Sequence, residues 1–359
     1  SIVLKKEGID LRGINFDAML ASYILKPSKN SHNLKEIAKS YLNRDIREYS
    51  ELPFENGEKD FRKIDISEAT HYAVEDSEVI WPLKKKLEQK LDERDQLDLL
   101  REIEIPLIRV LRDMELNGIK LEKEKLENSK EKIQNRLRNY QEEINELAGC
   151  QLNPNSPKQV REVLFEELNL PVIERTKTGP STNSRVLQEL SEKHPLPRKI
   201  IDFRELDKLL NTYVDKLPNF INTTTGKIHT SFNQTSTSTG RLSSSDPNLQ
   251  NIPKSSELGR TLRKAFVPSE NHILIGADYS QIELRLLAHL SRDKELLDTF
   301  KKGQDLHSKT AAQIFDVDIN EVDSKMRDRA KRVNFGIVYG ITPYGLSRDL
   351  GVDREEAQA

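Results

Sequence analysis

The segment RDRAKRVNFGIVYG, residues 327–340, carries Arg327, Lys331, Phe335 and Tyr339 at intervals of four residues. At ~100° per residue, successive members lie about 40° apart and form one slowly turning stripe along about 18 Å of helix. Guanidinium and ammonium groups bind phosphate oxygens, and flat rings pack against a sugar and a base, so this stripe suits a nucleoside triphosphate. A helix with one solvated end and one buried end would show the same pattern. The spacing by itself therefore leaves both interpretations open.

A second informative segment is HILIGADYSQIELR, residues 272–285. Its short apolar run ends in an acid, which predicts a buried strand with the Asp278 carboxylate emerging at the edge of a sheet. Phosphoryl transfer assisted by divalent ions needs a carboxylate on such a rigid support. An acid that caps the helix predicted for residues 283–291 is the alternative.

The composition restricts the chain to a few classes of protein. Its 359 residues suffice for roughly two or three domains. The 57 Lys and Arg are balanced by 59 Asp and Glu, so a polyanionic partner would have to be bound by local arrangement of charge. No apolar run approaches the roughly eighteen residues that cross a bilayer, and we expect no membrane partner. The single cysteine, Cys150, excludes an intramolecular disulfide and a cysteine-based zinc site, which fits a reducing cytoplasm.

Helical patterns dominate most of the chain. Apolar spacing predicts a series of helices, at residues 16–25, 68–91, 122–148, 308–315 and 324–340. Ser156 and Pro157 form a helix start signal, as N-cap and first helical residue. Residues 223–256 are instead rich in Ser, Thr, Asn and Gly, which indicates strands and loops. The first ten residues lack a signal-peptide core and begin as if within a domain.

Three segments resemble those of one enzyme family. Residues 327–340 match motif B of the family-A DNA polymerases, the DNA polymerase I group, in which Arg, Lys, Phe, Tyr and Gly recur in this order and spacing. DYSQIELR, residues 278–285, matches motif A, and TGRLSSSDPNLQNIP, residues 239–253, matches the segment that precedes motif A. Because three motifs occur in the family's order, the chain is identified as a member of this family over essentially its whole length.

The resemblance implies an α+β, helix-rich chain with a partial right-hand polymerase fold and a remnant of a ribonuclease-H-like 3′–5′ exonuclease domain. The implied domains are the C-terminal part of the exonuclease domain (1–96), a helical thumb and connection (97–222), the first part of the palm with motif A (223–304), and the start of the fingers with motif B (305–359).

The resemblance also implies which residues hold the metal and the triphosphate. Asp278, as a catalytic carboxylate, and the backbone carbonyl of Tyr279 would bind Mg²⁺, of which a complete polymerase site holds two ions. Arg327, Lys331 and His307 would contact the triphosphate of the incoming dNTP. Lys331 would also donate a proton to the pyrophosphate leaving group. For His307, a purely structural role is the alternative.

Four more residues would complete the nucleotide site by resemblance. Phe335 would support the sugar, and Tyr339 would pack near the templating base. Glu283 would block the 2′-hydroxyl of a ribonucleotide, although it could otherwise be an ordinary surface glutamate. Gln281 would contact the template-primer near the junction.

DNA binding is expected at the Ser- and Asn-rich segment. Arg241, Asn248, Gln250 and Asn251 resemble residues that read the minor groove beside the primer terminus. That groove presents acceptors at similar positions for every base pair, so arginine and amide donors there can test pair shape without reading sequence. Thumb lysines would add phosphate contacts with a steep salt dependence. Without the family match, the same residues would be interpreted as a polar surface loop.

A remnant of a proofreading site is expected near the N-terminus. Tyr72 and Asp76 form the YxxxD arrangement of the family's third exonuclease motif, where the acid binds metal and the tyrosine orients water. By itself this spacing occurs on many helices. The first two exonuclease motifs would precede Ser1, so the parent could proofread while this stretch is not expected to.

The second palm carboxylate of the family is not found in the sequence. Family-A enzymes carry it in motif C, a His-Asp-Glu sequence after the fingers, and residues 340–359 do not contain one. Asp349 and Asp353 lie too soon after motif B to replace it. We therefore expect the chain by itself to be inactive, and unpaired strand edges could make it aggregate.

These features predict that the parent protein is a template-directed DNA polymerase, adding dNTPs to a primer 3′ end by two-metal phosphoryl transfer. Its expected partners are primer-template DNA and dNTPs, bound by a monomer in the cytoplasm at the nucleoid, or in a host cytoplasm if the source is viral. For the chain as written, one alternative is an inactive module that grips primer-template. The other is a 3′–5′ exonuclease built on Tyr72 and Asp76.

Overall fold

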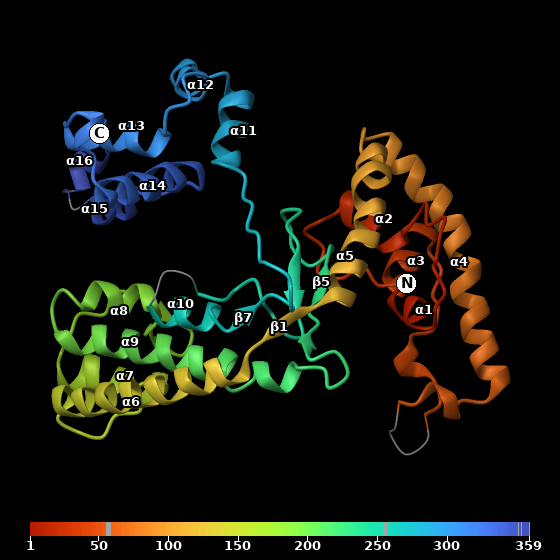
Figure 1. Cartoon of the computed structure of the whole chain (residues 1–359), viewed down its shortest axis with the longest axis horizontal. Helices are drawn as coiled ribbons and strands as arrows, with labels where there is room; N and C mark the ends of the chain where they lie inside the picture. Colours follow the sequence, from red (N-terminus) through yellow and green to blue (C-terminus); the bar gives the residue numbers. More distant parts are fainter. Residues whose placement is uncertain (55–58, 254–256, 351, 353, 359) are drawn as a thin grey trace. The chain divides into compact units, whose positions relative to one another are not determined.

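Helices make up most of the chain, and the computed structural model divides it into two units (Figure 1). The structure describes residues 1–54, 59–253, 257–350, 352 and 354–358. The first unit is Ser1–Leu274 and the second is Ile275–Ala359. Many helices with a few short antiparallel strands confirm the α+β, helix-rich class predicted from the sequence.

The N-terminal helices of the first unit pack around an aliphatic core. Val79, Leu83, Leu87 and Leu91 follow one another at four-residue intervals on one helix and are completely buried against the two helices that precede it. They share a face because residues four apart lie on the same side of an α-helix. The helices of this part are α1 (Ile2–Lys6), α2 (Ala18–Leu25), α3 (Leu34–Leu42), η1 (Tyr49–Glu51), η3 (Phe61–Lys63), α4 (Ile66–Asp92) and η4 (Leu99–Glu104). α2 and α4 confirm two predicted helices.

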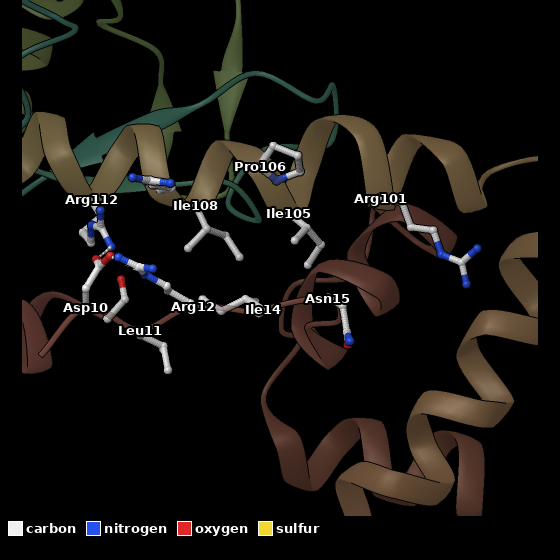
Figure 2. Close-up of a pocket in the computed structure, with 13 residues that line it drawn as sticks. Asp10, Leu11, Arg12, Ile14, Asn15, Arg101, Ile105, Pro106, Ile108 and Arg112 are labelled. Atoms are coloured by element: carbon white, nitrogen blue, oxygen red, sulfur yellow. Dashed lines mark hydrogen bonds and ion pairs between the residues drawn. The ribbon is translucent and has the colours of Figure 1, made fainter.

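A buried ion pair joins residues 10–15 to helix α5 (Ile105–Asn117) (Figure 2). Arg112, with only 5% of its side chain exposed, binds the carboxylates of Asp10 at 3.3 Å and Asp113 at 2.8 Å. Because arginine stays charged when it is buried, it needs such partners, and removing Asp10 would leave it with Asp113 alone. A hollow of about 610 Å³ lies between the two segments.

Two further cores lie along the long helix α6 (Lys123–Ala148), which the sequence predicted. Leu126 and Ile133 belong to one core near its start, and Ile144 belongs to the other near its end. The other helices of this part are α7 (Pro157–Arg161), η5 (Glu162–Glu167), α8 (Ser184–Leu190), α9 (Pro195–Leu209), η6 (Leu210–Val214), η7 (Leu217–Phe220) and α10 (Glu257–Arg263). Ser156 caps α7 by accepting a hydrogen bond from a backbone N–H at 3.4 Å, with Pro157 at the first position, as predicted. Within the described ranges, no helix is long and apolar enough for a membrane span.

A three-stranded antiparallel sheet connects the helical parts of the first unit. β1 (Ile119–Leu121) is its central strand, flanked by β4 (Lys227–Ile228) and β7 (Phe266–Val267). Gly118 precedes β1 with a φ of +57°, and an added Cβ would lie 2.7 Å from the Ile228 carbonyl oxygen. Only glycine fits this position without strain.

Two small sheets complete the first unit. β2 (Arg175–Thr176) pairs with β3 (Gly179–Pro180), and β5 (Ser231–Asn233) pairs with β6 (Ser243–Ser245). β4, β5 and β6 with their connecting loops confirm the prediction of strands and loops for residues 223–253. The last part of that prediction, residues 254–256, lies outside the described residues.

The second unit is built from helices joined by short connections. They are α11 (Ile282–Ser291), α12 (Lys294–Lys301), α13 (Leu306–Phe315), η8 (Ile319–Glu321), α14 (Ser324–Val338), α15 (Pro343–Leu350) and α16 (Arg354–Gln358). α13 and α14 pack against each other. α11, α13 and α14 confirm the helices predicted for this part of the chain.

The strand predicted for residues 272–278 is wrong. Residues 272–279 form neither helix nor strand, and Ile273 and Ile275 are 79% and 82% exposed. A strand needs a neighbour that satisfies its backbone hydrogen-bonding groups, and the described residues offer none to this segment. Asp278 therefore stands on an exposed segment rather than at the end of a buried strand.

Substituting Gly118 tests the junction between α5 and β1. Gly118→Ala should lower the free energy of unfolding by ~2 kcal/mol or more, because the new methyl group meets the Ile228 carbonyl and the backbone is strained. Urea denaturation followed by circular dichroism would measure the loss. The matched control is Gly149→Ala, where an added Cβ meets nothing within 4 Å and only the positive φ costs ~1 kcal/mol. Equal losses in both variants would contradict the close approach at Gly118.

Candidate functional site

Helix α14 carries the predicted stripe. It begins after Asp323, whose carboxylate accepts a hydrogen bond from a backbone N–H of the first turn at 2.7 Å. Arg327, Lys331 and Phe335 lie on the helix, and Tyr339 directly follows it. The rings of Phe335 and Tyr339 are stacked, with their centroids 6.5 Å apart and their planes 18° from parallel. The two cations and the two rings thus follow one another along one helix in the predicted order.

Asp305 was not among the predicted residues, yet it holds Arg327. The guanidinium binds side-on, from Nε to Oδ1 at 3.2 Å and from Nη2 to Oδ2 at 2.8 Å. The side-chain amide of Gln281 donates to Oδ2 at 3.1 Å, and the backbone N–H of Ser308 donates to Oδ1 at 2.7 Å. One carboxylate therefore joins the start of α13, the first half of α14 and the residue before α11.

These donors set the ionisation of Asp305. Burial would raise the pKa of the carboxyl group, but hydrogen bonds from Arg327 and from the Ser308 N–H outweigh burial and lower the pKa to about 2. The same contact raises the pKa of Arg327. At neutral pH the pair is a fully ionised carboxylate and guanidinium.

His307 lies beside the stripe and is only 2% exposed. Burial lowers the pKa of His307, Asp305 opposes that shift, and Arg327 and Lys331 add to it. The amide nitrogen of Asn334 lies 3.1 Å from Nδ1 and can only donate, so the neutral ring carries its proton on Nε2. The His307 and Phe335 rings have centroids 5.7 Å apart. His307 is thus positioned at the predicted site but covered by protein atoms.

A second contact joins the start of α11 to the end of α14. The hydroxyl of Tyr339 donates to the Glu283 carboxylate at 2.8 Å. Glu283 lies in the first turn of α11, next to Gln281, whose φ of +53° is uncommon for a residue with a side chain. Two predicted residues of the motif A segment are therefore tied to the helices that carry the predicted triphosphate ligands.

Asp278 and Tyr279 are exposed, Tyr279 to 80%. Within the described ranges, no hydrogen bond or ion pair joins Asp278 to Arg327 or Lys331, and no group of three metal-binding side chains occurs. Mg²⁺ commonly takes one or two carboxylates and completes its shell with water and substrate phosphates. The Asp278 carboxylate and the Tyr279 carbonyl are oxygen donors of this kind, so the residues present fit such an ion.

The four residues predicted to contact DNA lie in the first unit. The side chains of Arg241, Asn248, Gln250 and Asn251 are all exposed. The Asn248 side-chain oxygen accepts hydrogen bonds from the backbone N–H groups of Gln250 at 3.0 Å and Asn251 at 3.3 Å, which holds the turn. The Tyr213 hydroxyl donates to the Asn251 carbonyl at 2.6 Å. The backbone of this loop is therefore fixed while the predicted contact residues stay exposed.

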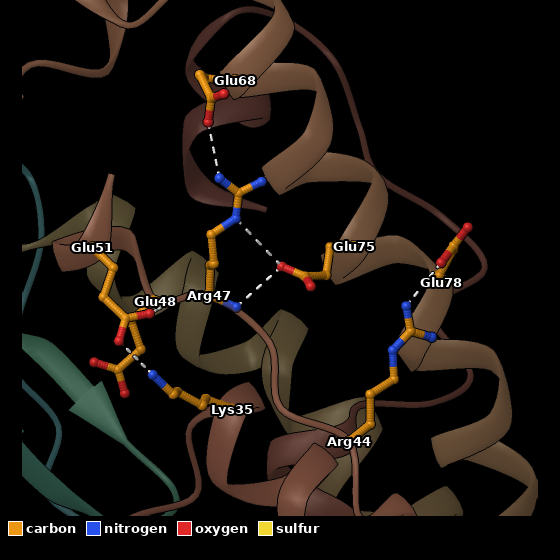
Figure 3. A network of polar contacts seen from close by, with 8 residues as sticks. All are labelled: Lys35, Arg44, Arg47, Glu48, Glu51, Glu68, Glu75 and Glu78. Atoms are coloured by element: carbon orange, nitrogen blue, oxygen red, sulfur yellow. Dashed lines mark hydrogen bonds and ion pairs between the residues drawn. The ribbon is translucent and has the colours of Figure 1, made fainter. Parts of the chain in front are cut away.

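Tyr72 and Asp76 lie one turn apart on α4 and are half-buried. Burial raises the pKa of Asp76, and a hydrogen bond from Tyr72 offsets this only in part. Burial likewise raises the pKa of Tyr72. The same half of α4 is anchored by Arg47, which binds Glu68 at 2.9 Å and donates its backbone N–H to Glu75 at 3.0 Å (Figure 3). The predicted exonuclease pair is therefore brought together on a supported helix.

Sequence reasoning missed Asp305 and Asn334. Asp305 carries a visible signal, because an acid directly before a predicted helix is a typical N-cap, but capping explains the acid without any second role. Asn334 has no such signal. Its amide contacts His307 and Thr310, which lie on the other helix of the α13–α14 pair. Only the packing of the two helices defines that role.

Comparisons with known proteins agree with this geometry. The model of the family described as DNA polymerase family A matches residues 123–359, and the model described as DNA polymerase I, ribonuclease H-like domain, matches residues 1–83. The chain belongs to DNA polymerase family A, with the end of a ribonuclease H-like exonuclease domain at its N-terminal side.

Individual relatives are similar along almost the whole chain. DNA polymerase I of Bacillus subtilis (strain 168) is 44% identical over 360 residues, covering 100% of this chain and 41% of that protein. DNA polymerase I of Geobacillus stearothermophilus is 44% identical over 358 residues, covering 99% and 41%. A solved structure, described as the POL domain of Pol1 from M. smegmatis in complex with DNA primer-template and dNTP, matches with a TM-score of 0.86 and 38% identity, covering 99% of this chain and 59% of that one. The chain thus spans about two fifths of the length of these curated relatives.

The Asp305–Arg327 pair makes a measurable prediction about pH. Because the folded pKa of about 2 lies below the ordinary 3.8, the stability gained from Asp305 is full above 3.8 and is lost as the pH falls toward 2. Arg327→Gln should raise the pKa of Asp305 toward its ordinary value, as measured by carboxyl ¹³C NMR titration. Arg332→Gln, at an exposed position of the same helix, is the control and should leave it unchanged. If the pKa of Asp305 is unchanged in Arg327→Gln, the hydrogen bond from Arg327 is not what lowers it.

Proposed function

We propose that this chain is the part of a template-directed DNA polymerase that holds the incoming dNTP and grips the primer-template. In the parent protein this part would serve addition of dNTPs to a primer 3′ end, by a monomer in the cytoplasm. The observation that carries the proposal is the α14 stripe, in which an ionised, held Arg327 precedes Lys331 and two stacked rings, in a chain of DNA polymerase family A.

In the proposed nucleotide site, charged groups bind the triphosphate and the rings contact the sugar and the base. Arg327 and the exposed Lys331 would bind the triphosphate oxygens, and the Lys331 ammonium would protonate the departing pyrophosphate. Phe335 would support the sugar and Tyr339 would pack near the templating base. Glu283, held at 2.8 Å from the Tyr339 hydroxyl, would exclude a 2′-hydroxyl. His307 is only 2% exposed, so its Nε2–H would reach the triphosphate only if the protein atoms that cover the ring moved.

Asp278 and the Tyr279 carbonyl would hold Mg²⁺. When bound, this ion supplies positive charge that stabilises the oxygens of the transferring phosphoryl group. The contribution of the chain is the pair of oxygen ligands on an accessible segment, together with Gln281 two residues further on. Gln281 would contact the template-primer near its junction while Asp305 holds its amide.

Primer-template binding would use the first unit. The exposed side chains of Arg241, Asn248, Gln250 and Asn251 stand on a fixed backbone, which suits recognition of minor-groove shape. The relative whose structure is described as a complex with DNA primer-template and dNTP supports this assignment. We propose residues 97–222 as the thumb and connection, 223–304 as palm and 305–359 as fingers, after an exonuclease remnant at 1–96.

A 3′–5′ exonuclease is the second candidate function. The paired, half-buried Tyr72 and Asp76 favour it, because a tyrosine beside a carboxylate suits a metal-dependent nuclease. In the described part of the chain, however, no group of three metal-binding side chains surrounds Asp76. We therefore propose that any 3′–5′ nuclease activity would belong to the parent rather than to these residues alone.

Nucleotide binding can be tested on the chain itself. Lys331→Ala should weaken binding of dTTP with Mg²⁺ about tenfold or more, because it removes a charge-assisted contact to phosphate. Isothermal titration calorimetry would measure the change. Lys325→Ala removes an equal charge from an exposed position on another face of α14 and is the matched control. If both variants weaken binding equally, Lys331 makes no specific phosphate contact and acts only by general electrostatic attraction.

Primer extension separates binding from catalysis. The 359-residue chain should bind a fluorescent primer-template in anisotropy measurements, with affinity falling steeply as salt rises, because phosphate contacts release counterions. It should not extend that primer with dNTPs and Mg²⁺, since two-metal transfer needs a second palm carboxylate and residues 340–359 contain no motif C. Robust extension would refute the need for a second carboxylate, and degradation of single-stranded DNA would favour the nuclease.

A further inference from the structure

We propose that Asp305 is a positioning residue of the nucleotide site, which holds the Arg327 guanidinium so that its remaining N–H groups meet the triphosphate. The inference rests on the proposed function, because it takes Arg327 as a triphosphate ligand. Asp305 contacts Arg327 and Gln281, and no contact with the nucleotide is proposed for it.

The geometry of the pair leaves Arg327 able to bind a second anion. A guanidinium has five N–H donors in a rigid plane, and the side-on contact engages one on Nε and one on Nη2. The donors on Nη1 stay available on the edge turned away from the Asp305 carboxylate. The Arg327 side chain is 39% exposed, so part of it is open to solvent, and we take the Nη1 edge as the one that a phosphate oxygen would meet.

Asp305 is itself held firmly enough to act as a support. Its Oδ1 caps α13 by accepting from the Ser308 N–H at 2.7 Å, and its Oδ2 accepts from Gln281 at 3.1 Å. The Asp305 carboxylate is therefore fixed at the N-terminus of α13, and it in turn holds the long Arg327 side chain of α14. Fixing a flexible arginine before the ligand arrives reduces the entropy lost on binding, which corresponds to about three- to tenfold in affinity.

The negative charge of Asp305 also repels a bound triphosphate. This repulsion weakens triphosphate binding, whereas the positioning of Arg327 strengthens it. If charge repulsion dominated, neutralising Asp305 would tighten triphosphate binding. If positioning dominates, the same change weakens it. The carboxylate already accepts four hydrogen bonds, two of them from a full positive charge, so its field toward a bound phosphate is largely cancelled. We therefore expect positioning to dominate.

The choice of substitution must separate positioning from helix capping. Asp305→Ser keeps an N-cap residue for α13 but is too short to reach Arg327, and Asp305→Asn keeps the cap and one acceptor oxygen. Asp293→Ser is the matched control, because Asp293 caps α12 through a 2.8 Å bond to the Leu296 N–H and has no role in the nucleotide site. All three variants change one aspartate at one helix start within the same unit.

The experiment measures Arg327 mobility and dTTP affinity on the full 359-residue chain. ¹⁵N NMR relaxation of the Arg327 Nε–H should show a restrained side chain in the parent sequence and a mobile one in Asp305→Ser. Calorimetry with dTTP and Mg²⁺ should show affinity weakened about three- to tenfold in Asp305→Ser, less in Asp305→Asn, and not at all in Asp293→Ser. Adding Arg327→Ala to Asp305→Ser should give no more loss than Arg327→Ala alone.

The outcomes distinguish this inference from the function it rests on. If the chain binds dTTP and Lys331→Ala weakens binding, but Asp305→Ser binds equally well or more tightly, the positioning role is wrong and the nucleotide site stands. An Arg327 side chain that stays rigid in Asp305→Ser would overturn the role as well. If neither Arg327→Ala nor Lys331→Ala changes dTTP binding, the proposed nucleotide site fails, and the positioning role fails with it.

Discussion

One partly exposed carboxylate in the second unit accepts four hydrogen bonds and links three of its segments. Asp305 caps α13, binds Arg327 of α14 side-on and receives the amide of Gln281 at the start of α11. Burying a charge is unfavourable unless donors replace the water it loses, and here those donors come from three different segments. Asp305 therefore links residues that are distant in the sequence. A cation, an amide and a helix terminus are neighbours around it.

The neutral imidazole of His307 lies next to the Asp305–Arg327 ion pair. His307 is buried, which disfavours its charged form, and Asn334 fixes its tautomer by donating to Nδ1. Tyr339 and Glu283 make a second link between α14 and the start of α11. Cations, neutral donors and rings thus occupy separate positions along a short helix pair. That separation is what a ligand with an anionic end and a flat end requires.

The exposed segment of residues 272–279 shows that a short apolar run does not by itself predict a strand. Ile273 and Ile275 have side chains suited to burial, yet they are exposed because no neighbouring strand among the described residues pairs with them. A strand forms only where a neighbouring strand pairs with its backbone groups, and it is buried only where other elements cover its faces. Local pattern specifies the preference for burial, whereas the neighbours decide whether it is met.

The sequence by itself determined the family, several of the longer helices and the identity of the candidate ligands. The four-residue spacing from Arg327 to Tyr339 is a property of one helix, and caps such as Ser156 are local signals that operate within a single turn. Tertiary structure decided what those residues touch. Asp305 supports Arg327, which is 22 residues further along the chain, and Glu283 pairs with Tyr339 across 56 residues. His307 is covered between helices and lies beside Phe335, 28 residues away. Such contacts follow from how helices pack, which no local pattern in the sequence records.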